Sequence, residues 1–282
     1  MKFNHSILLM SIFLLVSFLR SEILKQTFTI EGDDLEVQMD IDFAKVRVIQ
    51  SESATDLHVC IQYNQKAVSA KVIYDKPKNK IRIWVDQDDL FNSDDYDDDD
   101  HGRMVVIDLE LPYQPQLNLR TKIKAGTIDF RAGGLKLKGF ALKNWAGEID
   151  LDFDQPNQIV MESMDVNCKI GEVYISNLGN AHCSKVNINS GIGELTVDFC
   201  GKYADETFAD IDLDLGETTI ILPEATPIKM RVSHSTFFSS VQHPTAFRKH
   251  GKYYYSKEYQ QEQKALDLRI SSGIGELNFR TN

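Results

Sequence analysis

The second half of the chain repeats one pattern of polar and apolar positions. A glycine precedes a polar residue and then a short segment in which apolar and polar residues alternate. The six copies begin at Gly126, Gly147, Gly171, Gly193, Gly216 and Gly275. Successive glycines lie 21, 24, 22 and 23 residues apart, and the last one follows after 59 residues. A period of this length indicates one supersecondary unit stacked on copies of itself, because a single unit cannot bury its apolar face alone.

The alternation within each copy predicts a β-strand and not a helix. The residues two and four places after the glycine are both apolar in five of the six copies, whereas the apolar residues of a helix recur at every third or fourth position. Glycine fits a sharp corner at the start of such a strand, because it takes positive φ without steric cost and carries no Cβ toward the next coil. We therefore expect an all-β solenoid with coils of about 21–24 residues and with the six glycines as structural corners.

The strand pattern also predicts which side chains form the core. Successive side chains of a strand face opposite sides, so the positions two and four after each glycine should be buried. The expected core residues are Ile149, Leu151, Val173, Ile175, Leu195, Val197, Leu277 and Phe279. Asp150, Thr196 and Asn278 lie between them and are expected to face solvent.

The first part of the chain, over 22–112, lacks the glycine but predicts strands of its own. Apolar and polar residues alternate over 35–43, 45–49, 57–61, 71–74, 80–85 and 105–111. The open edge of a terminal strand is a template for aggregation, so a solenoid needs a cover at its end. We interpret 22–112 as that cap, or as a first set of coils without the glycine, and 113–282 as the repeat domain.

The long interval between Gly216 and Gly275 predicts an insertion, which we place at 229–265 as a hairpin excursion before the last coil. It contains Tyr253, Tyr254, Tyr255 and Tyr259. Two interpretations stand: these rings pack on the flank of the solenoid, or they form a partner-binding face, since tyrosine is a typical interface anchor. The four tyrosines are the candidate interaction surface.

The N-terminus predicts export. An apolar run from Ile7 to Leu19 is interrupted only by Ser11 and Ser17, and it is too short to cross a bilayer comfortably. We expect a signal peptide over 1–21, with an uncleaved transmembrane anchor through 7–19 as the alternative. The protein should then be periplasmic or at the cell surface. Export permits disulfides, and both pairing and free thiols stay open for Cys60, Cys168, Cys183 and Cys200.

The charge of the chain excludes some partners. A net charge of −11 and a pI near 5.1 oppose binding to nucleic acid and adhesion to anionic lipid. The acidic segment 94–100 lies in an expected loop over 86–103. A solvated loop and a calcium site are the two interpretations, but the segment lacks the glycine and the terminal glutamate of an EF-hand.

Residues for catalysis are scarce. The chain contains no HExxH, GxSxG, phosphate-loop or dinucleotide motif, and His234, His243 and His250 lack a metal-ligand spacing. The position after the corner glycine holds Glu148, Glu172, Glu194, Glu217 and Glu276. This ladder of like charges is explained by solvated side chains, by a row of cations, or by the paired carboxylates of a β-helix glycosidase or lyase. We predict no catalytic, cofactor or metal site.

Two phrases carry a family resemblance. Residues 189–198 (NSGIGELTVD) and 271–279 (SSGIGELNF) resemble the S-G-x-G-[DES]-[VIL] phrase of the bacterial "putative adhesin" and toast-rack domains of the cell envelope, and 107–112 resembles their leucine-proline entry into the coils. The resemblance implies a single-stranded, right-handed β-solenoid outside the cytoplasm, without catalytic residues. The chain departs from the pattern in its acidic loop and at Ala44, where such domains often have the first corner glycine.

The first functional hypothesis is a non-enzymatic, exported cell-envelope domain that serves as a scaffold or as an adhesin-like binding module for a protein or a glycan. The alternative is an envelope-stress sensing or regulatory domain that acts with a membrane partner. A carbohydrate-active β-helix enzyme is the second alternative, and turnover of a bound glycan would distinguish it.

Overall fold

The computed structural model describes residues 22–87, 104–203, 206–234, 239–241, 247–260 and 266–282. The expected signal peptide, the acidic segment 94–100 and His243 lie outside these residues. The strands are β1 (Glu22–Thr29), β2 (Asp34–Gln50), β3 (Asp56–Tyr63), β4 (Val68–Asp75), β5 (Lys80–Gln87), β6 (Val106–Leu111), β7 (Gln116–Arg131), β8 (Leu137–Asp152), β9 (Ser163–Ser176), β10 (Lys185–Asp198), β11 (Thr207–Leu222), β12 (Ile228–His234), β13 (Ser239–Val241), β14 (Arg248–His250), β15 (Tyr253–Tyr255) and β16 (Leu266–Thr281).

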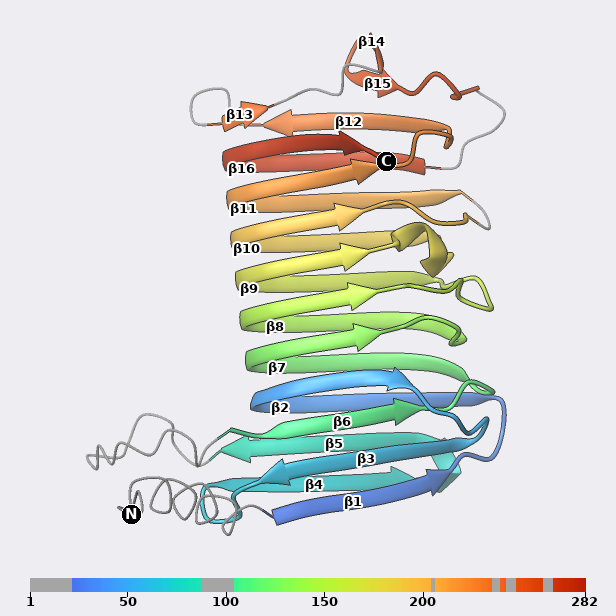
Figure 1. The fold of residues 1–282 in the computed structure, drawn as a ribbon, viewed down its shortest axis with the longest axis vertical. Coiled ribbons are helices and arrows are strands. Elements are labelled where there is room, and N and C mark those ends of the chain that lie inside the picture. Colours follow the sequence, from blue (N-terminus) through green and yellow to red (C-terminus); the bar gives the residue numbers. More distant parts are fainter. Residues whose placement is uncertain (1–21, 88–103, 204–205, 235–238, 242–246, 261–265) are drawn as a thin grey trace, which may run out of the picture.

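The long strands β7 to β11 and β16 are the coils of a solenoid. Each runs to one edge of the stack, bends there and returns along the other face (Figure 1). Neighbouring coils pair in parallel with their corner glycines in register, from Gly126↔Gly147 to Gly216↔Gly275. The coils rise as a single-stranded, right-handed solenoid (Figure 1). The predicted all-β solenoid is confirmed.

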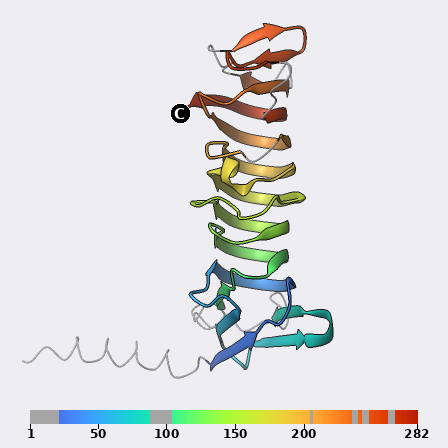
Figure 2. The same cartoon turned by 90° about the vertical axis from the view of Figure 1, so that its right-hand side faces the viewer.

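Strand β2 is itself a coil of this stack. It pairs in parallel with β7 from Asp34↔Gln116 to Val48↔Phe130, with Ala44 opposite Gly126. On its other side the stack divides, because β5 continues one half of β2 and β6 continues the other half. Among the described residues, no corner therefore lies beneath Ala44, which explains why an alanine suffices there. The antiparallel strands β1, β3 and β4 complete this end, seen at the base of Figure 2.

The opposite end of the stack has an unexpected strand order. The last strand, β16, lies between β11 and β12. The strand β12 pairs in parallel with Leu266–Ser272, and β13 pairs in parallel with Gly275–Leu277. The segment between β11 and β16 is therefore more than a hairpin excursion, because β12 and β13 together form one more coil. The hairpin itself is β14 with β15, and it covers the outer edge of β12.

The core is one apolar column between the two faces of the coils. Seven of the eight expected core residues are at most 1% exposed, and Phe279 in the last strand is half-buried. Asp150, Thr196 and Asn278 between them are half-buried on the outer faces. Among the described residues, no helix is long and apolar enough to cross a membrane.

Candidate interaction surfaces

The six corner glycines form one column along one edge of the stack. Their φ angles lie between 129° and 142°. A Cβ on Gly193 would lie 1.8 Å from the carbonyl oxygen of Gly171, and the other five glycines face the preceding corner at 1.8 or 1.9 Å. Real Cβ atoms do not approach a carbonyl oxygen so closely, so a side chain is excluded both by the backbone conformation and by space. The close approach of the coils at this edge depends on glycine.

The acidic ladder runs beside this column. Its five glutamates, from Glu148 to Glu276, are exposed, and neutral groups donate to two of them. The Tyr174 hydroxyl donates to Glu172 Oε2 at 2.9 Å, and Asn278 Nδ2 donates to Glu217 Oε1 at 3.0 Å. The bond to Glu172 raises the pKa of Tyr174 to about 12, with desolvation as the second cause. Among the described residues, no group of His, Cys, Asp or Glu side chains could hold a metal ion.

On the other side of the glycine column lies an apolar ridge that the alternation of the strands did not predict. It consists of Ile170, Ile192, Leu215 and Ile274, which are 43 to 55% exposed. Each precedes a corner glycine, and the four are in register on consecutive coils. The signal was present in the sequence as an aliphatic residue immediately before the glycine. Trp145, 69% exposed, lies at the same edge one coil earlier.

Tyr253, Tyr254 and Tyr255 form β15 of the hairpin at the far end of the stack (Figure 1), and Tyr259 follows in the segment after it. Tyr254 is buried and lies opposite Met230 of the core. The other three tyrosines are half-buried, with ring centroids 6.2 Å apart for Tyr253 and Tyr255 and 4.8 Å apart for Tyr255 and Tyr259. Each interpretation therefore describes some of these residues. Tyr254 packs against the stack, and the other three tyrosines form a row on the outer face.

A cation lies over one ring of this tyrosine row. Lys229 Nζ lies 4.9 Å from the ring centroid of Tyr253 and forms an ion pair of 2.6 Å with Asp267. This carboxylate is the main reason why the pKa of Lys229 is raised. A cation over a ring face and an aromatic row are features of binding surfaces as well as of packed cores. Their position at the end of the column makes them accessible to a large partner.

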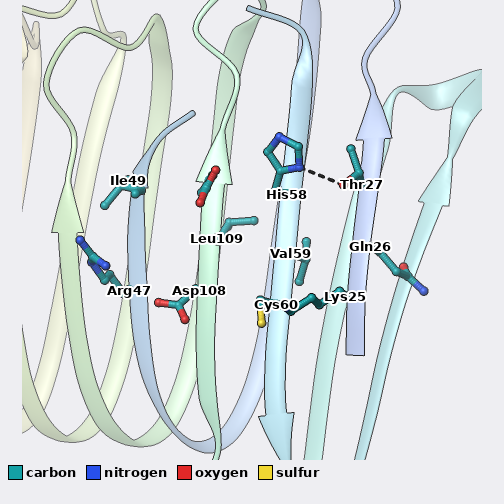
Figure 3. A pocket seen from close by; sticks show the side chains of 11 residues that line it. Lys25, Gln26, Thr27, Arg47, Ile49, His58, Val59, Cys60, Asp108 and Leu109 are labelled. Atoms are coloured by element: carbon teal, nitrogen blue, oxygen red, sulfur yellow. Dashed lines mark hydrogen bonds between the residues drawn. The ribbon is translucent and has the colours of Figure 1, made fainter. Parts of the chain in front are cut away.

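A cavity of about 390 Å³ lies at the other end of the molecule, on the outer face of β1, β3, β6 and β2 (Figure 3). Its polar side chains include Lys25, Arg47 and Asp108. Thr27 Oγ1 and His58 Nδ1 lie within hydrogen-bond distance at 2.9 Å. Cys60 is two residues from His58 on the same strand face, but the hydrogen bond of His58 goes to Thr27. The arrangement is a mixed-charge depression without a paired nucleophile and base.

The four cysteines are free thiols. Burial raises the pKa of Cys183 to about 12 and that of Cys200 to about 11, so both thiols are protonated and poor nucleophiles at neutral pH. His182 precedes Cys183 in a left-handed backbone conformation with φ of 49°. These residues belong to the packing of the stack.

Two family models match the chain. The model described as N-terminal domain of toast_rack, DUF2154, matches residues 20–176, which is more than half of the chain. The model described as cell wall-active antibiotics response LiaF, C-terminal, matches residues 170–279. Neither description names a catalytic activity. No curated protein matches the chain.

Several solved structures are similar to the chain. One, described as a "putative cell adhesion protein" from Clostridium sporogenes, is 12% identical and has a TM-score of 0.46, with 93% of this chain and 100% of that chain covered. Another, described as a "putative adhesin" from Bacteroides fragilis, is 11% identical and has a TM-score of 0.35, with 92% of this chain and 97% of that chain covered.

Proposed function

This chain belongs to the toast-rack family, and we propose that it is a non-enzymatic binding module of the cell envelope, exported to the periplasm or the cell surface. One observation carries the proposal: the column of stacked coils ends in a hairpin and a following segment that together hold a row of three half-buried tyrosines. Aromatic side chains held in place bind a partner at low conformational cost. The partner is a protein or a glycan of the envelope.

Co-sedimentation of the purified full chain with isolated cell walls tests the binding. Replacing Tyr253 and Tyr255 together with alanine should reduce the bound fraction about tenfold or more, because interface tyrosines are frequent hot spots. Tyr113→Ala is the matched control, since Tyr113 is also partly exposed but lies near the opposite end of the stack. Equal binding by the double variant and the control would reject the tip as the binding surface.

Export is tested separately. Cell fractionation of the full chain and of a version that begins at Glu22 should place only the full chain outside the cytoplasm. The same fractionation distinguishes the two alternatives for 7–19, because a cleaved signal peptide leaves a shorter, extractable protein and an anchor leaves the full-length chain with the membrane. Recovery of both versions in the cytoplasm would contradict the proposed location.

A second function is favoured by one finding, the match of residues 170–279 to the LiaF C-terminal model. That description refers to a response to antibiotics that act on the cell wall. In this case the chain regulates an envelope-stress response through a membrane partner. A strain that lacks the gene should then show a changed transcriptional response to a cell-wall antibiotic, and the Tyr253 and Tyr255 double variant should fail to restore it. An unchanged response in that strain would leave the binding module as the sole proposal.

A further inference from the structure

The hairpin end of the molecule carries charge opposite in sign to that of the whole chain. The cationic residues of 228–234 and 247–260 are Lys229, Arg231, Arg248, Lys249, Lys252 and Lys257. The same two segments contain one carboxylate, Glu258, whereas the net charge of the chain is −11. Like charges held close together repel each other and lower stability unless an anion offsets them. The cluster is therefore a candidate for anion binding.

Three of these cations meet at one cavity beneath the turn of the hairpin. The cavity has a volume of about 290 Å³ and is lined by Arg231, Val232, Ser233, Lys249, Gly251, Lys252 and Tyr254. The strand β12 contributes one wall, and β14, β15 and the turn between them contribute the other. No carboxylate is among these lining residues. A Cβ on Gly251 would meet no atom within 4 Å, so the turn leaves open space there.

Arg231, Lys249 and Lys252 are exposed and form no ion pair within the part of the chain that the structure describes. Lys249 Nζ lies 5.2 Å from the ring centroid of Tyr254, a contact that positions the ammonium group without neutralising it. Lys229, in contrast, already has Asp267 as its partner. The charge of this cavity is thus available to a ligand.

The mixture of donors indicates the kind of anion. A guanidinium group donates two parallel hydrogen bonds to a phosphate, and an ammonium group acts on it as a compact point charge. The Ser233 hydroxyl adds a neutral donor at the same wall. One arginine, two lysines and a serine around a space of this size match a tetrahedral anion with several acceptor oxygens better than a single carboxylate.

We propose that this cavity binds the phosphate group of a phosphate ester. The site differs from the tyrosine surface, because neither Tyr253 nor Tyr255 lines the cavity. Lys249 is paired with Tyr254 and lies on the side away from the tyrosine row, whereas Arg231 is paired with Tyr253 on the side of the row. The phosphate ester comes either from a soluble or polymeric glycerol phosphate or from a phospholipid headgroup.

Calorimetric titration of the full chain with glycerol 3-phosphate tests the first source, and co-sedimentation with phosphatidylglycerol vesicles tests the second. Binding to at least one probe is expected, and it should weaken as sodium chloride screens the charges. The triple variant Arg231→Gln, Lys249→Gln, Lys252→Gln should bind that probe about tenfold more weakly or worse. Lys185→Gln on the flank of the stack is the matched control and should bind as the native chain does, because Lys185 is exposed and belongs to no ion pair among the described residues.

Each outcome of these titrations either supports the proposed site or contradicts it. Loss of binding in the triple variant but not in the control supports the cavity, and the probe that is bound identifies the source of the phosphate. Binding to neither probe overturns the proposal, as does binding that the triple variant retains. The replaced side chains are exposed, so melting temperatures of the variants should match that of the native chain and show that a loss of binding is not a loss of fold. The Tyr253 and Tyr255 double variant should keep phosphate binding, which distinguishes this proposal from the proposed wall-binding function.

Discussion

Replacing Gly193 with alanine should destabilise the protein far more than an ordinary glycine substitution. The added Cβ would lie 1.8 Å from the carbonyl oxygen and 2.8 Å from the carbonyl carbon of Gly171, so the two coils must separate by more than about 1 Å to reach normal contact. Both are backbone atoms in the middle of the stack, so no flexible side chain can yield.

The magnitude follows from two contributions. A non-glycine residue at φ of 139° costs about 1–3 kcal/mol of backbone strain. Separation of the coils weakens the ladder hydrogen bonds next to the corner, each worth about 0.5–1.5 kcal/mol. Loss of two or three of them brings the expected total to about 2–7 kcal/mol. For a chain of this size, the melting temperature should fall by about 2–4 °C for each kcal/mol.

Thermal and urea denaturation followed by circular dichroism measure this effect. The control is Gly251→Ala, because Gly251 also has positive φ, 60°, but its Cβ would meet nothing within 4 Å. It should cost about 1–2 kcal/mol, the penalty for the left-handed conformation alone. If the two variants lose equal stability, the clash between coils contributes nothing and the account of the corner is wrong.

Three further outcomes are expected. Val197→Ala should lower the free energy of unfolding by about 2–3 kcal/mol and Thr196→Ala by less than about 0.5 kcal/mol, because only Val197 is in the core. Urea denaturation measures both effects. The reverse order would mean that the assigned strand register is wrong by one residue. The pKa of Tyr174 should be near 12 in an absorbance titration and nearer the ordinary tyrosine value of 10.0 in Glu172→Gln. Its raised pKa stabilises the fold below about pH 10, and this contribution disappears as pH rises through 12; an unshifted titration in the variant would remove Glu172 as the cause. Millimolar calcium should raise the melting temperature no more than sodium chloride of equal ionic strength, and a calcium-specific rise that is lost when 97–100 become asparagine would make the acidic segment a metal site.

The repeated part of the fold could be predicted from the sequence more completely than the two ends of the stack. The period of the glycines and the alternation after them predicted the coils and their register, because the coils share a similar local pattern and pair with coils of the same kind. The coil made by β12 and β13 was not predicted, since no corner glycine marks it and its neighbour β16 comes much later in the chain. Local patterns report the strands but not the order in which distant strands pair.

For the candidate surfaces too, the sequence predicted local features but not those that depend on the pairing of distant strands. The tyrosines were identified as an aromatic run, but alternation along a strand that was not yet placed could not say that Tyr254 faces the core and its neighbours do not. The apolar ridge was missed because Ile192 and its counterparts precede the glycine, at a bend where the alternation of the strand is interrupted. The phosphate cavity brings Arg231 and Lys249 together across β12 and the hairpin, a contact that depends on tertiary pairing.

The position of β16 sets an order on the assembly of the molecule. The strands β12 and β13 leave the growing chain before β16, yet β16 is the strand that joins them to the rest of the stack. Until it inserts, the top coil and its hairpin have no coil of the column to pair with, and β11 presents an open edge. The outermost coil is therefore joined to the stack by an inner strand, β16, which comes after that coil in the sequence. Both surfaces at the tip, the tyrosine row and the basic cavity, lie on β12, the hairpin and the segment after it, so their attachment to the column depends on β16, and a chain that stops before Leu266 would lack that connection.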